Sequence, residues 1–252
     1  MACCCTFTNS VDQQFTSKKA GQELERFRRK GAGPTTRLLL AGIAQAGVGD
    51  GTLLDVGAGV GALTFELLDR GFRRAVIVEA SAGYTAAASK EATRRGRATD
   101  IDFVSGDFLE VAGTVPMASV VALDRVVCCY PLYEELLREA LRHAERGFAF
   151  SYPRDRWYVR AGMRLENAVR RSRRNGFRTF VHPETKMREL ITRAGFDLVS
   201  QRRTLVWSSD VFVRRAPSVA IMGLRKGYVL ELLGVAELEH GPRNDRVRIA
   251  SR

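Results

Sequence analysis

Short apolar runs alternate with amphipathic stretches along most of the chain. Apolar runs bounded by Gly, Ser or Asp predict buried strands at 53–56, 75–79, 101–104, 118–124 and 147–152. The stretches between them carry apolar residues at helical spacing and predict helices at 62–70, 81–95 and 131–144. Regular alternation of strand and helix predicts a mostly parallel sheet with right-handed crossovers and helices on both faces.

The two ends of the chain depart from this alternation. Residues 18–46 predict two helices, because Gly31-Ala32-Gly33-Pro34 breaks the pattern and Thr35 or Thr36 can cap the second. Beyond a helix at 183–194, the runs 196–200 and 204–213 predict a closing antiparallel pair.

These patterns predict three regions. Residues 1–47 form an N-terminal arm and a helical cap, the arm (1–16) being polar and poorly ordered. Residues 48–216 form an α/β domain with a basic helical insert at 153–180. Residues 217–252 lack clear periodicity and are expected to be an appendage, partly disordered.

The strongest chemical signal is the run Leu53-Leu54-Asp55-Val56-Gly57-Ala58-Gly59-Val60-Gly61. A buried strand enters a turn whose glycines let backbone approach a ligand, and a helix N-terminus follows. Gly57, Gly59 and Ala62 fit a dinucleotide fingerprint loosely. However, Asp55 would lie beside the pyrophosphate of a dinucleotide and suits a ligand with a positively charged head.

Acidic residues recur at predicted strand ends, where ligands of open α/β sheets bind. Asp55, Glu79, Asp107 and Asp124 all hold such positions. Glu79 is placed to accept both hydroxyls of a ribose. Asp107 could accept from an adenine amino group while Phe108 covers the ring.

The run Asp55-x-Gly57-x-Gly59-x-Gly61 resembles the first motif of the class I S-adenosylmethionine-dependent methyltransferases. The resemblance spans roughly residues 50–213. It implies a Rossmann-like class I methyltransferase fold with an antiparallel final strand and S-adenosyl-L-methionine as the cofactor. It also implies that Asp55, Gly57, Gly59, Gly61, Glu79, Asp107, Phe108 and Asp124 bind that cofactor.

Later segments resemble a bacterial group similar to magnesium-protoporphyrin O-methyltransferases. They are Leu123-Asp124-Arg125-Val126-Val127-Cys128-Cys129-Tyr130-Pro131, Ser151-Tyr152-Pro153-Arg154-x-x-Trp157 and Phe180-Val181-His182-Pro183. The resemblance implies O-methylation of a carboxylate or hydroxyl on a small molecule. Tyr130 would line the methyl site. A carboxylate needs no general base, whereas a hydroxyl would, and His182 or a surface His143 are the candidates.

Charge widens the range of partners. The formal net charge is +12, from 40 Lys and Arg against 28 Asp and Glu, which favours an anionic small molecule or RNA. A helix over 156–174 would place an arginine stripe on one face. Ala161, Leu165, Ala168 and Val169 would lie on another, packed down as a lid. An RNA methyltransferase, a non-catalytic binding domain and a nicotinamide-dependent oxidoreductase therefore remain alternatives.

Composition adds a few expectations. No apolar run reaches the roughly 18–20 residues that a membrane span needs, and Met1-Ala2-Cys3-Cys4-Cys5 does not resemble a signal peptide, so a cytoplasmic protein is expected. The five cysteines fall in two adjacent clusters, which argues against a disulfide framework, and we expect no metal site. The sequence leaves the oligomeric state open.

Overall fold

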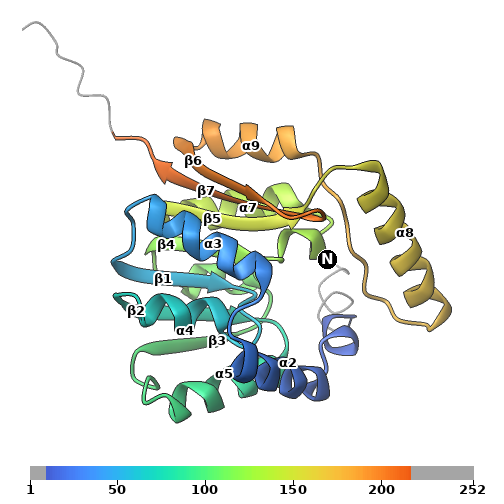
Figure 1. The fold of residues 1–252 in the computed structure, drawn as a ribbon, viewed down its shortest axis with the longest axis horizontal. Helices are drawn as coiled ribbons and strands as arrows, with labels where there is room; N and C mark the ends of the chain where they lie inside the picture. Colours follow the sequence, from blue (N-terminus) through green and yellow to red (C-terminus); the bar gives the residue numbers. More distant parts are fainter. Residues whose placement is uncertain (1–9, 217–252) are drawn as a thin grey trace, which may run out of the picture. The chain divides into compact units, whose positions relative to one another are not determined.

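The chain folds around one twisted sheet, shown in the computed structural model of Figure 1, which describes residues 10–216. The strand order is β3-β2-β1-β4-β5-β7-β6. The strands are β1 (Gly51–Val56), β2 (Phe72–Glu79), β3 (Ile101–Ser105), β4 (Ala118–Asp124), β5 (Ala144–Pro153), β6 (Phe196–Arg203) and β7 (Trp207–Arg214). The first five pair in parallel, and β7 runs antiparallel to both β5 and β6. The predicted mostly parallel sheet with a closing antiparallel pair is confirmed.

Helices cover both faces of this sheet. They are α2 (Ser17–Lys30), α3 (Pro34–Gln45), α4 (Ala62–Leu68), α5 (Ala82–Arg94), α6 (Phe108–Val111), α7 (Tyr133–His143), α8 (Trp157–Ser172) and α9 (Glu184–Arg193). Strand residues alternate between two apolar clusters, so that Leu53 packs with α2, α3, α4 and α5 while Leu54 packs with α7 and α9. Because both faces of the sheet are buried, the sequences of its strands are nearly continuous apolar runs.

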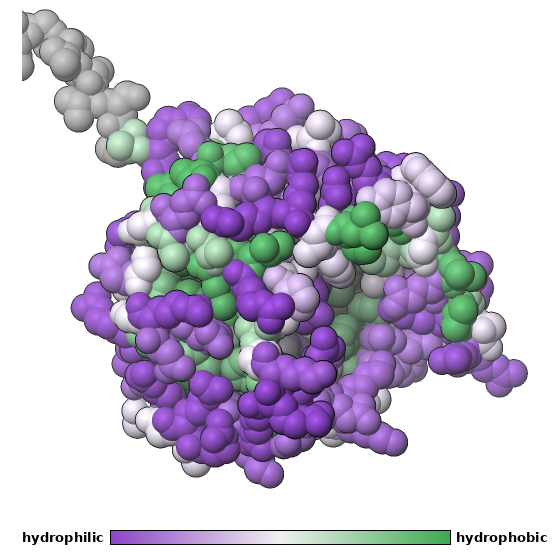
Figure 2. All heavy atoms as spheres, viewed as in Figure 1, coloured by the Kyte–Doolittle hydropathy of each residue, from purple (hydrophilic) through white to green (hydrophobic). Residues whose placement is uncertain are grey.

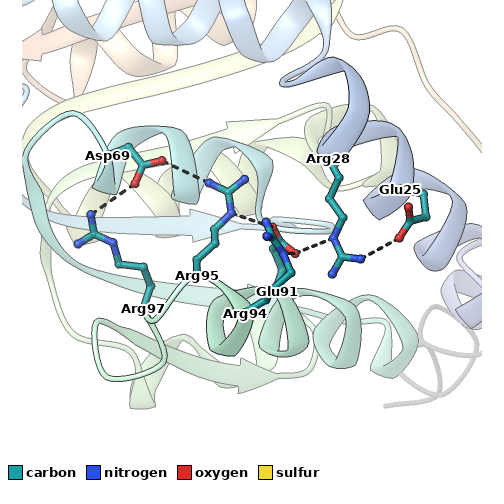
Figure 3. Close-up of polar contacts among 7 residues, drawn as sticks. All are labelled: Glu25, Arg28, Asp69, Glu91, Arg94, Arg95 and Arg97. Carbon is teal, nitrogen blue, oxygen red and sulfur yellow. Dashed lines mark hydrogen bonds and ion pairs between the residues drawn. The ribbon is translucent and has the colours of Figure 1, made fainter.

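The helical cap is anchored to the sheet domain through one buried carboxylate. Glu91 of α5 is buried and accepts hydrogen bonds from Arg28 of α2 at 2.9 Å, from Arg94 and from Arg95 (Figure 3). The guanidinium of Arg95 also lies 5.0 Å from the ring centroid of Phe27. This network ties α2 to α5, and residues 10–215 belong to one compact unit.

The segment 10–16 differs from the polar, poorly ordered arm that we predicted. Residues 10–14 are helical and Val11 is 5% exposed. The Phe15 ring meets those of Tyr84 and Phe177 edge-on, at centroid distances of 5.7 and 5.2 Å. Too few apolar residues stand here to give a periodic signal, and tertiary contacts order the segment. The predicted appendage at 217–252 lies outside the described residues.

The insert also differs from its prediction. Helix α8 forms, and it stands to one side of the sheet in Figure 1. The predicted apolar stripe does not pack down, because Leu165 is 68% exposed and Val169 41% exposed. Val159 is instead the buried residue of α8, so a different face of the helix points to the body of the protein.

Candidate cofactor and acceptor site

A cavity of about 290 Å³ opens where the carboxyl ends of β1, β2 and β4 meet. This is the edge at which open α/β sheets bind ligands. The predicted residues that line it are Gly57, Gly59, Glu79, Phe108, Asp124 and Tyr130. Asp55, Gly61, Asp107 and His182 are not among the lining residues, and the contacts of each are described below.

The glycine turn forms one wall of the cavity, and its backbone requires glycine. Gly57, Gly59 and Gly61 have φ values of 64°, 59° and 78°, in the left-handed region that side chains disfavour. A Cβ at Gly57 would lie 2.6 Å from Cγ2 of Val126, which itself lines the cavity. Gly61 is the N-cap of α4 and fixes the start of that helix. The turn therefore offers backbone, without side chains, to a ligand.

Glu79 holds this turn against the end of β2. Its two carboxylate oxygens accept from the backbone N–H of Gly59 at 2.8 Å and of Ser81 at 2.9 Å. Burial raises the pKa of Glu79, and those two hydrogen bonds oppose the rise. An ionised carboxylate has about four acceptor sites, so Glu79 can still accept from a ligand's hydroxyl groups.

Asp55 lies behind the turn, 1% exposed. One carboxylate oxygen accepts from the Thr64 hydroxyl at 2.7 Å, and the other has no partner among the described residues. Burial raises the pKa of Asp55 to about 7, and the charges of Asp124 and Glu79 contribute to the rise. Buried carboxylates without a cationic partner favour a positively charged ligand nearby.

Asp124 completes this acidic group from the end of β4. Its carboxylate accepts from the hydroxyls of Thr36 and Ser151, each at 2.5 Å. Arg125, the next residue, adopts a φ of 63°, and its N–H donates to the Ser151 hydroxyl at 2.8 Å. Among the described residues, neither Asp55, Glu79 nor Asp124 forms an ion pair. Three carboxylates without a cationic partner among the described residues are therefore gathered at the glycine-rich end of the cavity.

A hydrogen bond joins Tyr130, which lines the cavity, to Asp107, which does not. The Tyr130 hydroxyl donates to Asp107 at 2.6 Å, and the same oxygen of Asp107 caps α6 by accepting from Leu109 N–H at 3.1 Å. Burial, together with the charge of Asp107, raises the pKa of Tyr130 far above its usual value. Phe108, the residue after Asp107, is buried and lines the cavity together with Tyr130.

Both candidate histidines make structural contacts. His182 is buried, its Nε2 lies 3.1 Å from the carbonyl oxygen of Val127, and its ring stacks on Tyr133 at 4.2 Å. Burial lowers the pKa of His182. His182 therefore braces the short turn η2 (Val127–Cys129), and its catalytic role stays a prediction. His143, expected on the surface, is buried and lies 3.1 Å from the carbonyl oxygen of Ala112.

The insert and the N-terminal segment, which we expected to close over the acceptor, provide part of the cavity through residues that sequence analysis did not single out. Arg170 of α8 lines it, stacks over Phe177 at 5.4 Å from the ring centroid and donates to Thr179 at 3.1 Å. The segment 10–16 reaches the same place, where Gln14 accepts from the Asn175 side chain at 3.1 Å. The last contact joins residues about 160 positions apart in the chain, so no local pattern signals it.

Thiols also line the cavity. Cys128 and Cys129 are free, and their Sγ atoms lie 3.9 Å apart on η2. Within residues 10–216 no cluster of three or more His, Cys, Asp or Glu side chains could hold a metal ion. The predicted cysteine cluster at 3–5 lies outside the described residues.

Comparison with known proteins agrees with this geometry. Residues 53–147 match the family model described as a methyltransferase domain. No curated protein matches the chain.

Solved structures share the fold at low identity. A magnesium protoporphyrin IX methyltransferase from Synechocystis, crystallised with bound S-adenosylhomocysteine, has a TM-score of 0.61 and 17% identity, covering 81% of this chain and 98% of that one. An O-methyltransferase family protein from Burkholderia thailandensis has a TM-score of 0.58 and 17% identity, covering 72% and 57%. A putative sarcosine dimethylglycine methyltransferase from Galdieria sulphuraria has a TM-score of 0.57 and 13% identity, covering 72% and 85%.

The family match falls on the glycine turn and the strands that bound the cavity, and the fold extends the likeness over most of the chain. On this evidence the chain has the Rossmann-like fold of class I methyltransferases, and residues 53–147 match a methyltransferase domain.

Proposed function

We propose that the cavity binds S-adenosylmethionine and that the protein transfers its methyl group to the oxygen of a small carboxylate or hydroxyl acceptor. One observation carries the proposal: three acidic side chains without ion pairs to described residues surround a glycine turn at the ligand-binding edge of the sheet. A sulfonium and an ammonium group would neutralise that acidic end, whereas the pyrophosphate of a dinucleotide would be repelled.

The proposed cofactor contacts follow the walls of the cavity. Glu79 would accept from the ribose hydroxyls, and Phe108 would cover the adenine ring beside Asp107. Asp124 and the buried Asp55 would favour the positively charged end of the cofactor. Gly57, Gly59 and Gly61 would give the backbone the shape that admits it.

The remaining lining residues support a small and anionic acceptor. Val126, Met163 and Trp207 supply apolar lining, and Arg125 supplies positive charge, whereas Arg170 is paired with Glu166, which also lines the cavity. The Arg125 guanidinium forms no hydrogen bond or ion pair with another described residue. A carboxylate suits such a guanidinium because the two groups can form paired hydrogen bonds.

The chain's part in the reaction would be positioning and exclusion of water. The cofactor supplies an activated methyl group when bound. Arg125 would hold the acceptor in line, while Phe177 and Met163 cover the cavity from the insert. An ionised carboxylate attacks without losing a proton. The Tyr130 hydroxyl donates to Asp107 and is a poor base, which favours an acceptor that needs none.

A cytoplasmic location also belongs to this proposal. The free thiols of Cys128 and Cys129 support action in a reducing compartment. Separately, none of the helices within residues 10–216 has the length and apolar character that crossing a membrane requires.

Calorimetric titration with S-adenosylhomocysteine, with NADH as the control ligand, tests the cofactor assignment. We expect binding of the former alone. Glu79→Gln should weaken it at least about tenfold, because an amide cannot accept from two backbone N–H groups and a ribose at once. Glu110→Gln, an exposed carboxylate on α6, is the matched control and should change nothing. Equal affinity in wild type and Glu79→Gln would contradict the proposed ribose contact.

The acceptor is tested by incubation with methyl-labelled cofactor and a panel of small carboxylates and phenols. A carboxyl methyl ester is cleaved by mild base, whereas a methyl ether survives. Base-labile label would support carboxylate methylation, and base-stable label would indicate a hydroxyl acceptor. Labelling of RNA but of no small molecule would overturn the proposed acceptor class.

A further inference from the structure

The outer face of α8 exposes a stripe of apolar side chains. Trp157 is 81% exposed, Leu165 68% and Val169 41%, and Ala161 and Ala168 extend the stripe at helical spacing. We call these five residues the α8 stripe. Figure 2 shows apolar surface over α8 at the edge of the molecule, bordered by hydrophilic surface. An exposed apolar stripe on a surface helix marks a contact with something outside the chain.

Positive charge runs along the same helix face. Arg160, Arg164 and Arg171 flank the α8 stripe and are exposed. Arg160 pairs with Asp155 at 2.5 Å. The guanidinium groups of Arg164 and Arg171 form no hydrogen bond or ion pair with a described residue, so they are available to an external anion.

The opposite face of α8 belongs to the cavity. Met163, Glu166 and Arg170 line it, and Val159 is buried. The β6–β7 hairpin adds apolar surface beside the start of the helix: Leu205 is 74% exposed, and its carbonyl accepts from the Tyr158 hydroxyl at 2.9 Å. One face of α8 thus lines the cavity, and another face, the α8 stripe, is exposed to the exterior.

We propose that the α8 stripe docks on an anionic lipid membrane. A tryptophan, a leucine and a valine between arginines is the composition of an interfacial helix, which buries its apolar face among acyl chains and keeps its cations at the headgroups. The membrane contact does not depend on the proposed methyl acceptor. It would hold the cavity, which lies against the other face of α8, close to molecules dissolved in the bilayer.

Two other occupants fit the same surface less well. A second copy of the chain would bring the unpaired guanidinium groups of Arg164 and Arg171 toward those of its partner, and like charges across an interface are unfavourable. RNA would use the arginines, but Leu165 and Val169 can neither stack on a base nor donate a hydrogen bond to one. A lipid surface uses both the cations and the aliphatic side chains.

Cosedimentation of the full chain with phosphatidylcholine vesicles, with and without phosphatidylglycerol, tests the proposal. We expect binding to the anionic vesicles only, and weaker binding as salt rises. Leu165→Glu should weaken binding at least about tenfold, because a leucine would otherwise leave water. Arg164→Gln and Arg171→Gln should each weaken it about fivefold.

Matched controls come from outside the α8 stripe. Leu132→Glu changes a leucine of similar exposure near α7, and Arg193→Gln changes an exposed arginine on α9. Both should bind vesicles like the wild type. All of these side chains are exposed, and titration with S-adenosylhomocysteine reports independently that each variant retains its cavity.

Specific results would overturn the proposal. One is failure to bind anionic vesicles at low salt by a protein that still binds S-adenosylhomocysteine. Another is vesicle binding that Leu165→Glu leaves unchanged. Retention on RNA that the arginine substitutions abolish and Leu165→Glu does not would assign the face to nucleic acid. Dimerisation that Leu165→Glu abolishes would assign it to a second copy.

Discussion

Replacing Asp55 by asparagine should stabilise the ligand-free protein while weakening cofactor binding. The carboxylate is buried, one of its oxygens has no partner among the described residues, and the other accepts from the Thr64 hydroxyl. Ionised Asp55 is therefore a cost to the folded state that a bound cation would relieve. An asparagine at this position would keep an acceptor for Thr64 and carry no charge.

The magnitude follows from the pKa of Asp55. Burial raises it from 3.8 to about 7, so the folded protein holds a proton that the unfolded chain releases between these pH values. The free energy of unfolding therefore falls as pH rises through this window, by about 4 kcal/mol in total. The asparagine amide adds a donor without a partner, which costs about 1–3 kcal/mol. A net gain of about 1–3 kcal/mol above pH 7 remains.

Urea unfolding at pH 5 and pH 8 isolates this effect from other titrating groups. Wild type and variant are compared at each pH, and the stability advantage of Asp55→Asn should grow by about 3 kcal/mol between them. Asp102→Asn, an exposed carboxylate paired with Arg74, is the control and should show a difference below about 0.5 kcal/mol. An advantage that is the same at both pH values would refute the reasoning.

Calorimetry tests the second expected effect of Asp55→Asn, which is weaker cofactor binding. Loss of the charge should weaken S-adenosylhomocysteine binding at least about tenfold, since opposite charges several ångströms apart interact by a few kcal/mol near a protein surface. In the wild type the affinity should fall as pH drops below about 7, where Asp55 becomes protonated. Unchanged affinity in Asp55→Asn would remove Asp55 from the cofactor site.

Three further substitutions test the glycine turn, the contact between the helical cap and α5, and the Tyr130 hydroxyl in the cavity wall. Gly57→Ala forces a Cβ to 2.6 Å from Val126 at a φ of 64°, so it should cost about 2–4 kcal/mol in unfolding free energy and abolish calorimetric binding; normal binding would contradict the close approach. Glu91→Gln removes the carboxylate whose pKa the arginine hydrogen bonds, first Arg94, lower to about 2. It should cost about 3 kcal/mol in urea unfolding at pH 7, a difference that shrinks as pH falls from about 4.5 toward 2; a pH-independent difference would contradict the linkage. Tyr130→Phe should weaken S-adenosylhomocysteine binding several-fold, because Asp107 loses the hydrogen bond that orients its carboxylate, while methyl transfer to an identified acceptor continues. Complete loss of methyl transfer would instead indicate a catalytic role for the Tyr130 hydroxyl.

The elements and the glycine turn were predictable because their causes are local. Apolar periodicity distinguishes strand from helix within a few residues, and alternation of the two implies parallel pairing. A run of glycines at Gly57, Gly59 and Gly61 after a buried strand needs no distant contact to be recognised. The edge of the sheet that carries the site followed from the same alternation.

The roles of the acids needed the tertiary structure. Asp55, Glu79 and Asp107 stand at equivalent places in the sequence pattern, yet of these three only Glu79 lines the cavity. Asp55 faces Thr64 behind the turn, and Asp107 receives the Tyr130 hydroxyl. A carboxylate at a strand end can point in several directions, and its neighbours from other elements decide which.

The sequence by itself therefore determined the sheet, its helices and the glycine turn. Only the tertiary structure decided the orientation of α8 and the closure of the cavity. Periodicity identified the apolar stripe of α8, which is exposed. The face that packs on the body of the protein is a different one and carries Val159, Met163 and Arg170. Hydrophobic pattern reports which residues share a face, whereas the partner that covers the face is fixed by contacts between segments far apart in the chain.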